Sequence, residues 1–113
     1  VAGRDPAAYI RKYNGRLEVL HLKDYILKDP EHKGNMYALI DENGQDDINI
    51  DVSESENFDF RPLGEGQVGV PAIIDAAEEC NMKWYVVEQD RSSDRPALDA
   101  VKASIDYLRS LQK

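Results

Sequence analysis

The sequence predicts an α/β fold in which parallel strands alternate with helices. Two short and nearly continuous apolar runs, residues 17–22 and 83–88, are typical of strands that are covered on both faces. Segments with the apolar spacing of amphipathic helices precede, separate and follow these runs. Buried strands that alternate with helices favour βαβ units and a parallel sheet.

Start and stop signals support the predicted helices. Asp5 is a typical N-cap, Pro6 suits the first helical position, and Gly15 is a typical stop. A second amphipathic helix is expected over residues 70–80 and a third from about residue 96 to residue 111. Apolar side chains recur in the third helix at steps of three and four, and predict its packed face: Leu98, Val101, Ile105 and Leu108.

A long polar connection, residues 26–57, interrupts this alternation. It contains many turn-forming residues and an acidic stretch, and connections of this length inside a compact domain are functional or disordered. We therefore expect one domain over residues 1–113 with a loop insertion at 26–57. Short strands are expected within the insertion at 36–40 and 48–52, and an extended segment is expected after it at 58–63.

Composition and charge exclude several classes of protein. The 113 residues carry a net charge of −8, and Lys and Arg are scattered among acids rather than gathered into a basic patch, so a nucleic-acid partner is not expected. No run of ~18 apolar residues could span a membrane. The single cysteine, Cys80, excludes an intrachain disulfide. An acidic cytoplasmic protein is the expectation.

The polar residues that could carry chemistry follow the two predicted strands. In barrels of parallel strands, active sites form at the carboxyl ends of the strands. Strand alternation places two sets of side chains on one face each, namely Leu17, Val19, His21 and Lys23, and Trp84, Val86 and Glu88. An imidazole and a carboxylate that meet there form a partial ligand set for a divalent metal ion. The structural alternative is a hydrogen-bonded core histidine, whereas a buried carboxylate requires a partner or a metal.

Two further features are candidates for substrate contact. The turn Gly64-Glu65-Gly66 precedes a predicted helix and could bring Glu65 or backbone N–H groups to an anionic or polyol substrate, or be a plain structural turn. Trp84 is either a core residue or part of an apolar pocket wall.

Three motifs together resemble the sugar phosphate isomerase/epimerase family, which has the xylose isomerase-like TIM barrel. They are Leu-His-Leu-Lys-Asp-Tyr at residues 20–25, Pro-Leu-Gly-Glu-Gly at 62–66 and Trp-Tyr-Val-Val-Glu-Gln-Asp at 84–90. Their order and spacing are similar to the last three β/α units of that barrel, and the resemblance covers nearly all of the chain outside 26–57. Because a whole (β/α)₈ barrel has ~250 residues, the resemblance implies that this chain is its C-terminal portion.

The resemblance also implies a metal site and a reaction. In that family two glutamates, an aspartate and a histidine bind a divalent ion such as Mn²⁺, Zn²⁺, Mg²⁺ or Co²⁺. The histidine matches His21 and the last glutamate matches Glu88, whereas the other two ligands belong to earlier strands. Glu88 would also be a catalytic acid or base for proton transfer through an enediolate of a sugar substrate. Lys23, Glu65 and Trp84 complete the expected substrate-binding residues.

Three functions are compatible with these observations. The first is part of a metal-dependent sugar (phosphate) isomerase or epimerase. The second keeps the barrel and changes the reaction, as in an inosose dehydratase or a hydroxypyruvate isomerase. The third is a non-catalytic scaffold or interaction fragment. With two of four ligands we expect the 113-residue chain to be inactive alone, and unpaired strand edges predict a homo-oligomer or completion by the missing barrel part.

Overall fold

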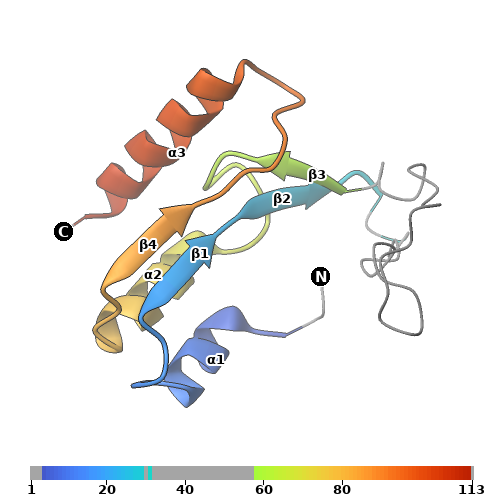
Figure 1. Cartoon of the computed structure of the whole chain (residues 1–113). Helices are drawn as coiled ribbons and strands as arrows, with labels where there is room; N and C mark the ends of the chain where they lie inside the picture. The colour runs from blue at the N-terminus through green and yellow to red at the C-terminus, as the bar shows by residue number, and fades with distance from the viewer. Residues whose placement is uncertain (1–3, 30, 32–57, 113) are drawn as a thin grey trace, which may run out of the picture.

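Two parallel strands form the centre of the fold. The computed structural model describes residues 4–29, 31 and 58–112 (Figure 1). Strand β1 (Val19–Leu22) pairs in parallel with β4 (Trp84–Val87), so that Val19 lies opposite Trp84 and Leu22 lies opposite Val87. The structure is a mixed α/β arrangement of helices around a small parallel sheet, and the predicted α/β class is confirmed at this level.

A second, antiparallel pair of strands continues from β1. After Lys23 the chain enters β2 (Asp24–Leu27), which pairs with β3 (Phe58–Arg61). The first two residues of the expected insertion, Ile26 and Leu27, lie in β2, because they are apolar residues that suit a strand and pair with β3. The extended segment expected at 58–63 is confirmed over β3. Most of the insertion, with the strands expected at 36–40 and 48–52, lies outside the described residues.

The helices begin near the predicted residues. Helix α1 (Pro6–Lys12) is capped by Asp5, whose carboxylate accepts a hydrogen bond of 2.9 Å from the N–H of Ala7. Helix α2 (Val70–Glu79) follows the glycine turn at residues 64–66, and α3 (Ala97–Leu111) is the last element of the described chain. No helix in the described ranges is long and apolar enough to cross a membrane.

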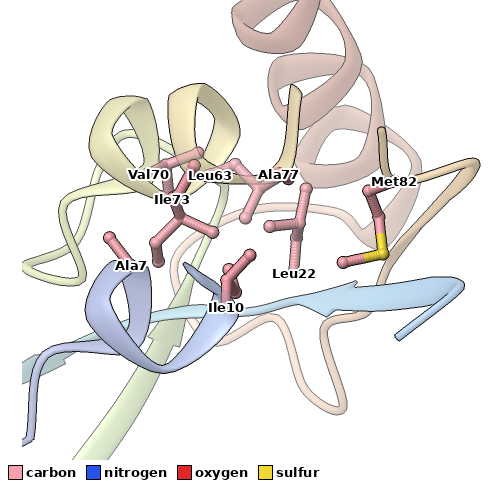
Figure 2. Packing of buried hydrophobic residues seen from close by; sticks show 9 residues of the cluster. Ala7, Ile10, Leu22, Leu63, Val70, Ile73, Ala77 and Met82 are labelled. Carbon is pink, nitrogen blue, oxygen red and sulfur yellow. The ribbon is translucent and has the colours of Figure 1, made fainter. Parts of the chain in front are cut away.

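The core lies on one face of the parallel pair. Helices α1 and α2 pack against each other, and Leu22 of β1 reaches between them, as Figure 2 shows. Partly buried side chains from the end of α3 close the cluster. The buried apolar residues of this core are Ala7, Ile10, Leu22, Leu63, Val70, Ile73, Ala76, Ala77 and Met82.

The opposite face of the same strands is open. Val19, Trp84 and Val86, which alternate with the core-facing residues, are 49%, 67% and 40% exposed. Together with Leu17, which is 40% exposed, they form an apolar surface that we call the open face. The sequence predicted that these residues share a face, but no element of the described chain buries them as a strand of a parallel sheet would require.

Only part of the predicted packed face of α3 is buried. Leu98 and Val101 are 82% and 53% exposed, so this half of the expectation is wrong. The helix instead approaches the rest of the fold through small residues, because Ala100 and Ser104 allow close contact and the Ser104 hydroxyl accepts a 3.1 Å hydrogen bond from the N–H of Leu63.

Candidate functional site

The carboxyl end of the parallel pair brings His21 and Glu88 together. The ladder extends one residue past β4, because the N–H of Glu88 donates to the carbonyl of Leu22 at 3.0 Å. Nδ1 of His21 lies 2.9 Å from Oε2 of Glu88, although the two residues are 67 positions apart in the sequence. The predicted approach of these side chains at one rim of the sheet is confirmed, and their metal-binding and catalytic roles stay predictions.

Lys23 joins the same cluster between two carboxylates. Its Nζ lies 3.1 Å from Oε1 of Glu88 and 3.0 Å from Oδ2 of Asp90. The ammonium also lies 5.6 Å from the centre of the Phe60 ring on β3, within the range of a cation–π contact. The Glu88 carboxylate therefore faces an imidazole with one oxygen and an ammonium with the other. We call His21, Lys23, Glu88 and Asp90 the rim cluster.

These contacts shift two protonation equilibria. Hydrogen bonds from His21 and then from Lys23 hold the pKa of Glu88 below its usual range. Burial acts to lower the pKa of Lys23, but hydrogen bonds to Asp90 and Glu88 outweigh it and raise that pKa. Both groups are therefore charged at neutral pH. A carboxylate with a lowered pKa is a good cation ligand, and it becomes a stronger base when its partners move away.

Solvent reaches every member of the rim cluster. The side chains of His21, Lys23, Glu88 and Asp90 are 62%, 37%, 40% and 50% exposed. Within the described residues, no group of three or more His, Cys, Asp or Glu side chains is arranged to hold a metal ion. The pair of His21 and Glu88 offers one nitrogen and one carboxylate, which is a partial set of donors.

The glycine turn binds a carboxylate of the protein itself. Asp24 is 2% exposed, and its Oδ2 accepts hydrogen bonds from the N–H groups of Gly64 at 2.9 Å and Gly66 at 3.0 Å. Its Oδ1 accepts from Val68 at 3.1 Å and from Tyr25 at 2.9 Å. The backbone N–H groups of Gly64 and Gly66, which the sequence offered as contacts for an anionic substrate, thus donate to Asp24. A side chain at position 66 would overlap this carboxylate, which explains the glycine.

The other two predicted substrate residues are not brought to the rim cluster. Glu65 pairs with Arg95, whose Nη1 donates to Oε1 at 2.8 Å, and this pair raises the pKa of Arg95. Trp84 begins β4 whereas Glu88 follows its end, so the two Cα atoms are separated by about 13 Å along the strand. Of the predicted site residues, the structure brings together His21, Lys23 and Glu88.

A buried ionic group links β3 to the loop after β4. Asp59 is 5% exposed and accepts hydrogen bonds of 2.7 Å from the hydroxyl of Ser93 and 2.6 Å from Nη1 of Arg61. Burial acts to raise the pKa of Asp59, but the bonds from Ser93 and Arg61 lower it overall. With the pair of Glu65 and Arg95, this group fixes the loop that carries Asp90.

Sequence reasoning missed Asp90 and Asp24, and the signals for them differ. Asp90 lies two residues after Glu88, and strand alternation would have placed both on one face. The role of Asp24 depends on a turn 40 residues away that turns back toward it, and no local pattern encodes that contact.

The fold and the cluster define a small α/β unit with a charged site at the carboxyl end of parallel strands. Comparison of the chain with protein-family models, with curated proteins and with solved structures gives no match.

Proposed function

We propose that the chain is the C-terminal portion of a metal-dependent sugar (phosphate) isomerase or epimerase with a xylose isomerase-like barrel. The observation that carries this proposal is the 2.9 Å contact of His21 with Glu88 at the carboxyl ends of adjacent parallel strands. Active sites of parallel α/β barrels form at this edge of the sheet. The resemblance of the three motifs supplies the family.

Two side chains of the rim cluster are of the kinds that a divalent ion accepts as ligands. An imidazole nitrogen and a carboxylate oxygen are ligands that Zn²⁺, Mn²⁺ and Co²⁺ accept, and both side chains are open to solvent. His21 and Glu88 would hold the ion, and the remaining ligands would come from other strands of the barrel. When bound, such an ion polarises the carbonyl and hydroxyl oxygens of a sugar or polyol.

Residues of the chain itself would transfer the proton and bind the substrate. Glu88 removes or returns a proton at the carbon next to the substrate carbonyl, because its carboxylate stands at the rim and is charged at neutral pH. Lys23 donates hydrogen bonds to substrate oxygens from the same rim. Below them, Val19 and Val86 of the open face would form an apolar floor of the site once further strands cover that face.

The open face supports completion of the sheet by further strands. Parallel sheets are normally covered on both faces, and the apolar open face has the alternation of a barrel interior. The missing strands would come from the remainder of the barrel or from a second copy of the chain. Either source would add the carboxylates that the rim cluster lacks.

An interaction module is the rival from another class of protein. The exposed Trp84 favours it, since a large apolar side chain at a surface is typical of a docking site. In this alternative the ion pairs of Glu88 are structural only, and a substitution at Glu88 changes no chemistry. The dehydratase and hydroxypyruvate isomerase alternatives share the site and differ in the substrate that reacts.

The test measures proton exchange at carbon. The complete polypeptide that carries this chain is incubated with Mn²⁺ and a panel of ketoses, inososes and hydroxypyruvate in D₂O, and loss of the exchangeable C–H signal is followed by NMR. Glu88→Gln should lower the exchange rate by at least ~10²-fold, as expected for a general base. The control is Glu79→Gln, which removes another exposed glutamate that is paired with Arg11 on the far helices.

Three results decide between the functions. Loss of exchange in Glu88→Gln together with an unchanged Glu79→Gln supports the proposal, and the reactive substrate selects among the enzymes. A fully active Glu88→Gln variant contradicts it. If the 113-residue chain alone exchanged protons at the rate of the complete polypeptide, this would contradict the proposal that its site is incomplete.

A further inference from the structure

The Lys23 ammonium forms an ion pair with Glu88, whose carboxylate is a ligand of the proposed metal ion. Nζ lies 3.1 Å from Oε1 of Glu88 and 3.0 Å from Oδ2 of Asp90, so one cation is shared by two anions. A divalent ion on Glu88 would stand within a few ångströms of this ammonium. Like charges at such a separation repel each other. Lys23 is the side chain that can move, because it has a second partner in Asp90.

The surroundings restrict how Lys23 can respond. The next residue, Asp24, is buried and accepts hydrogen bonds from N–H groups of the glycine turn, so the backbone beside Lys23 is held in place. The Phe60 ring lies 5.6 Å from Nζ and keeps the ammonium near the rim. Rotation of the side chain remains available, and Asp90 is a second carboxylate partner, with Oδ2 at 3.0 Å from Nζ.

We propose that Lys23 is the resident counter-cation of Glu88, displaced when a divalent ion binds, and that Asp90 is the positioning residue that receives the displaced ammonium. This regulation of the site rests on the proposed metal-binding role of His21 and Glu88. Lys23 lowers the affinity for the ion, Asp90 moderates that effect, and the ammonium stays at the rim beside the substrate oxygens.

A simpler electrostatic account makes a different prediction. If Asp90 acts only as a nearby negative charge or as a direct ligand, its removal weakens ion binding whether Lys23 is present or not. If Asp90 acts by holding Lys23, its removal matters only while Lys23 is there. A double-mutant cycle separates these accounts because it measures the coupling between the two side chains.

The experiment titrates Mn²⁺ into the 113-residue chain and measures free Mn²⁺ by EPR, which follows weak binding into the millimolar range. The variants are Lys23→Met, Asp90→Asn, the double variant and Glu88→Gln. Lys102→Met is the matched control, because it removes an exposed lysine that is paired with Asp106 on α3. Circular dichroism checks that each variant keeps the wild-type fold.

Lys23→Met should tighten Mn²⁺ binding about three- to ten-fold, from loss of a nearby competing charge that solvent partly screens. Asp90→Asn should weaken it about two- to three-fold in the wild type and leave it unchanged in the Lys23→Met background. Lys102→Met should bind as the wild type does.

Three results would overturn the inference. Equal affinity of Lys23→Met and wild type, with weaker binding in Glu88→Gln, refutes the counter-cation while the proposed metal site stands. An Asp90→Asn effect of the same size in both backgrounds refutes the positioning role. Unchanged affinity in Glu88→Gln refutes the metal site itself and the inference with it.

Discussion

Asp24 and Glu88 both follow the end of a parallel strand, and their surroundings make them opposites. Asp24 is buried, and backbone N–H groups donate hydrogen bonds to both of its carboxylate oxygens. Glu88 is half exposed, and its oxygens face the side chains of His21 and Lys23. Backbone donors cannot leave, whereas side-chain donors can rotate away.

The comparison separates a structural carboxylate from an exchangeable one. Asp24 holds the glycine turn against the start of β2, and no outside ligand can displace it without opening the fold. Glu88 can exchange its partners for a metal ion or a substrate at the cost of exposed ion pairs, which contribute little to stability. The same distinction applies to the two faces of the sheet, of which one is sealed by α1 and α2 and one is open.

The largest expected effect is at Asp24. Asp24→Ala should lower the free energy of unfolding by about 3–5 kcal/mol, because several buried N–H groups lose their acceptor at once. Urea denaturation followed by circular dichroism measures this change. Asp90→Ala is the matched control at an exposed aspartate and should stay within about 0.5 kcal/mol of wild type. An Asp24→Ala variant as stable as Asp90→Ala would remove the basis of the comparison.

A smaller effect is expected where the glycine turn contacts Asp24. A Cβ atom at Gly66 would overlap the Asp24 carboxylate, so Gly66→Ala should cost about 2–3 kcal/mol by displacing the turn. Gly15→Ala is the control, since Gly15 has φ of 81° but open space around it, and should cost about 1 kcal/mol from backbone strain alone. Equal costs at the two glycines would show that the contact with Asp24 is loose.

The smallest of the three concerns the pH dependence of Asp59, a buried carboxylate with side-chain partners. Its pKa in the fold is lowered below the ordinary 3.8, so its contribution is present at neutral pH and is lost as the pH falls below about 4. Asp59→Asn should lower stability at pH 7 by about 1–2 kcal/mol and reduce the loss between pH 4 and pH 2. Urea midpoints across that range measure both changes.

Asp99→Asn, an exposed substitution in the first turn of α3, should keep the acid-induced loss of the wild type. If Asp59→Asn lost stability in acid as steeply as Asp99→Asn, the bonds from Ser93 and Arg61 would not be the source of the pH dependence.

The sequence predicted the elements whose signals are local. The cap at Asp5 and the parallel strands follow from spacing and residue type, and strand alternation was sufficient to bring His21 and Glu88 to one rim. The other two residues of the rim cluster, Lys23 and Asp90, lie two positions after His21 and Glu88. Only Lys23 was recognised from the sequence.

The remainder depends on contacts between distant segments. Pairing with β3 turns Ile26 into a strand residue, and close approach of α3 through Ala100 and Ser104 leaves Leu98 exposed. Neither can be predicted from periodicity, because apolar spacing says which side chains could be buried and not whether a partner covers them. The acceptor of the glycine turn was missed for the same reason.

The most direct test of the account locates a divalent ion on the chain. Mn²⁺ is added in small amounts to the ¹⁵N- and ¹³C-labelled 113-residue chain, and paramagnetic broadening is mapped by NMR. The account predicts that the His21 ring and the Glu88 signals broaden first, and that Glu88→Gln abolishes this selectivity while the fold is retained. Broadening centred instead on the acidic groups Asp75, Glu78 and Glu79 of α2, or unchanged by Glu88→Gln, would contradict it.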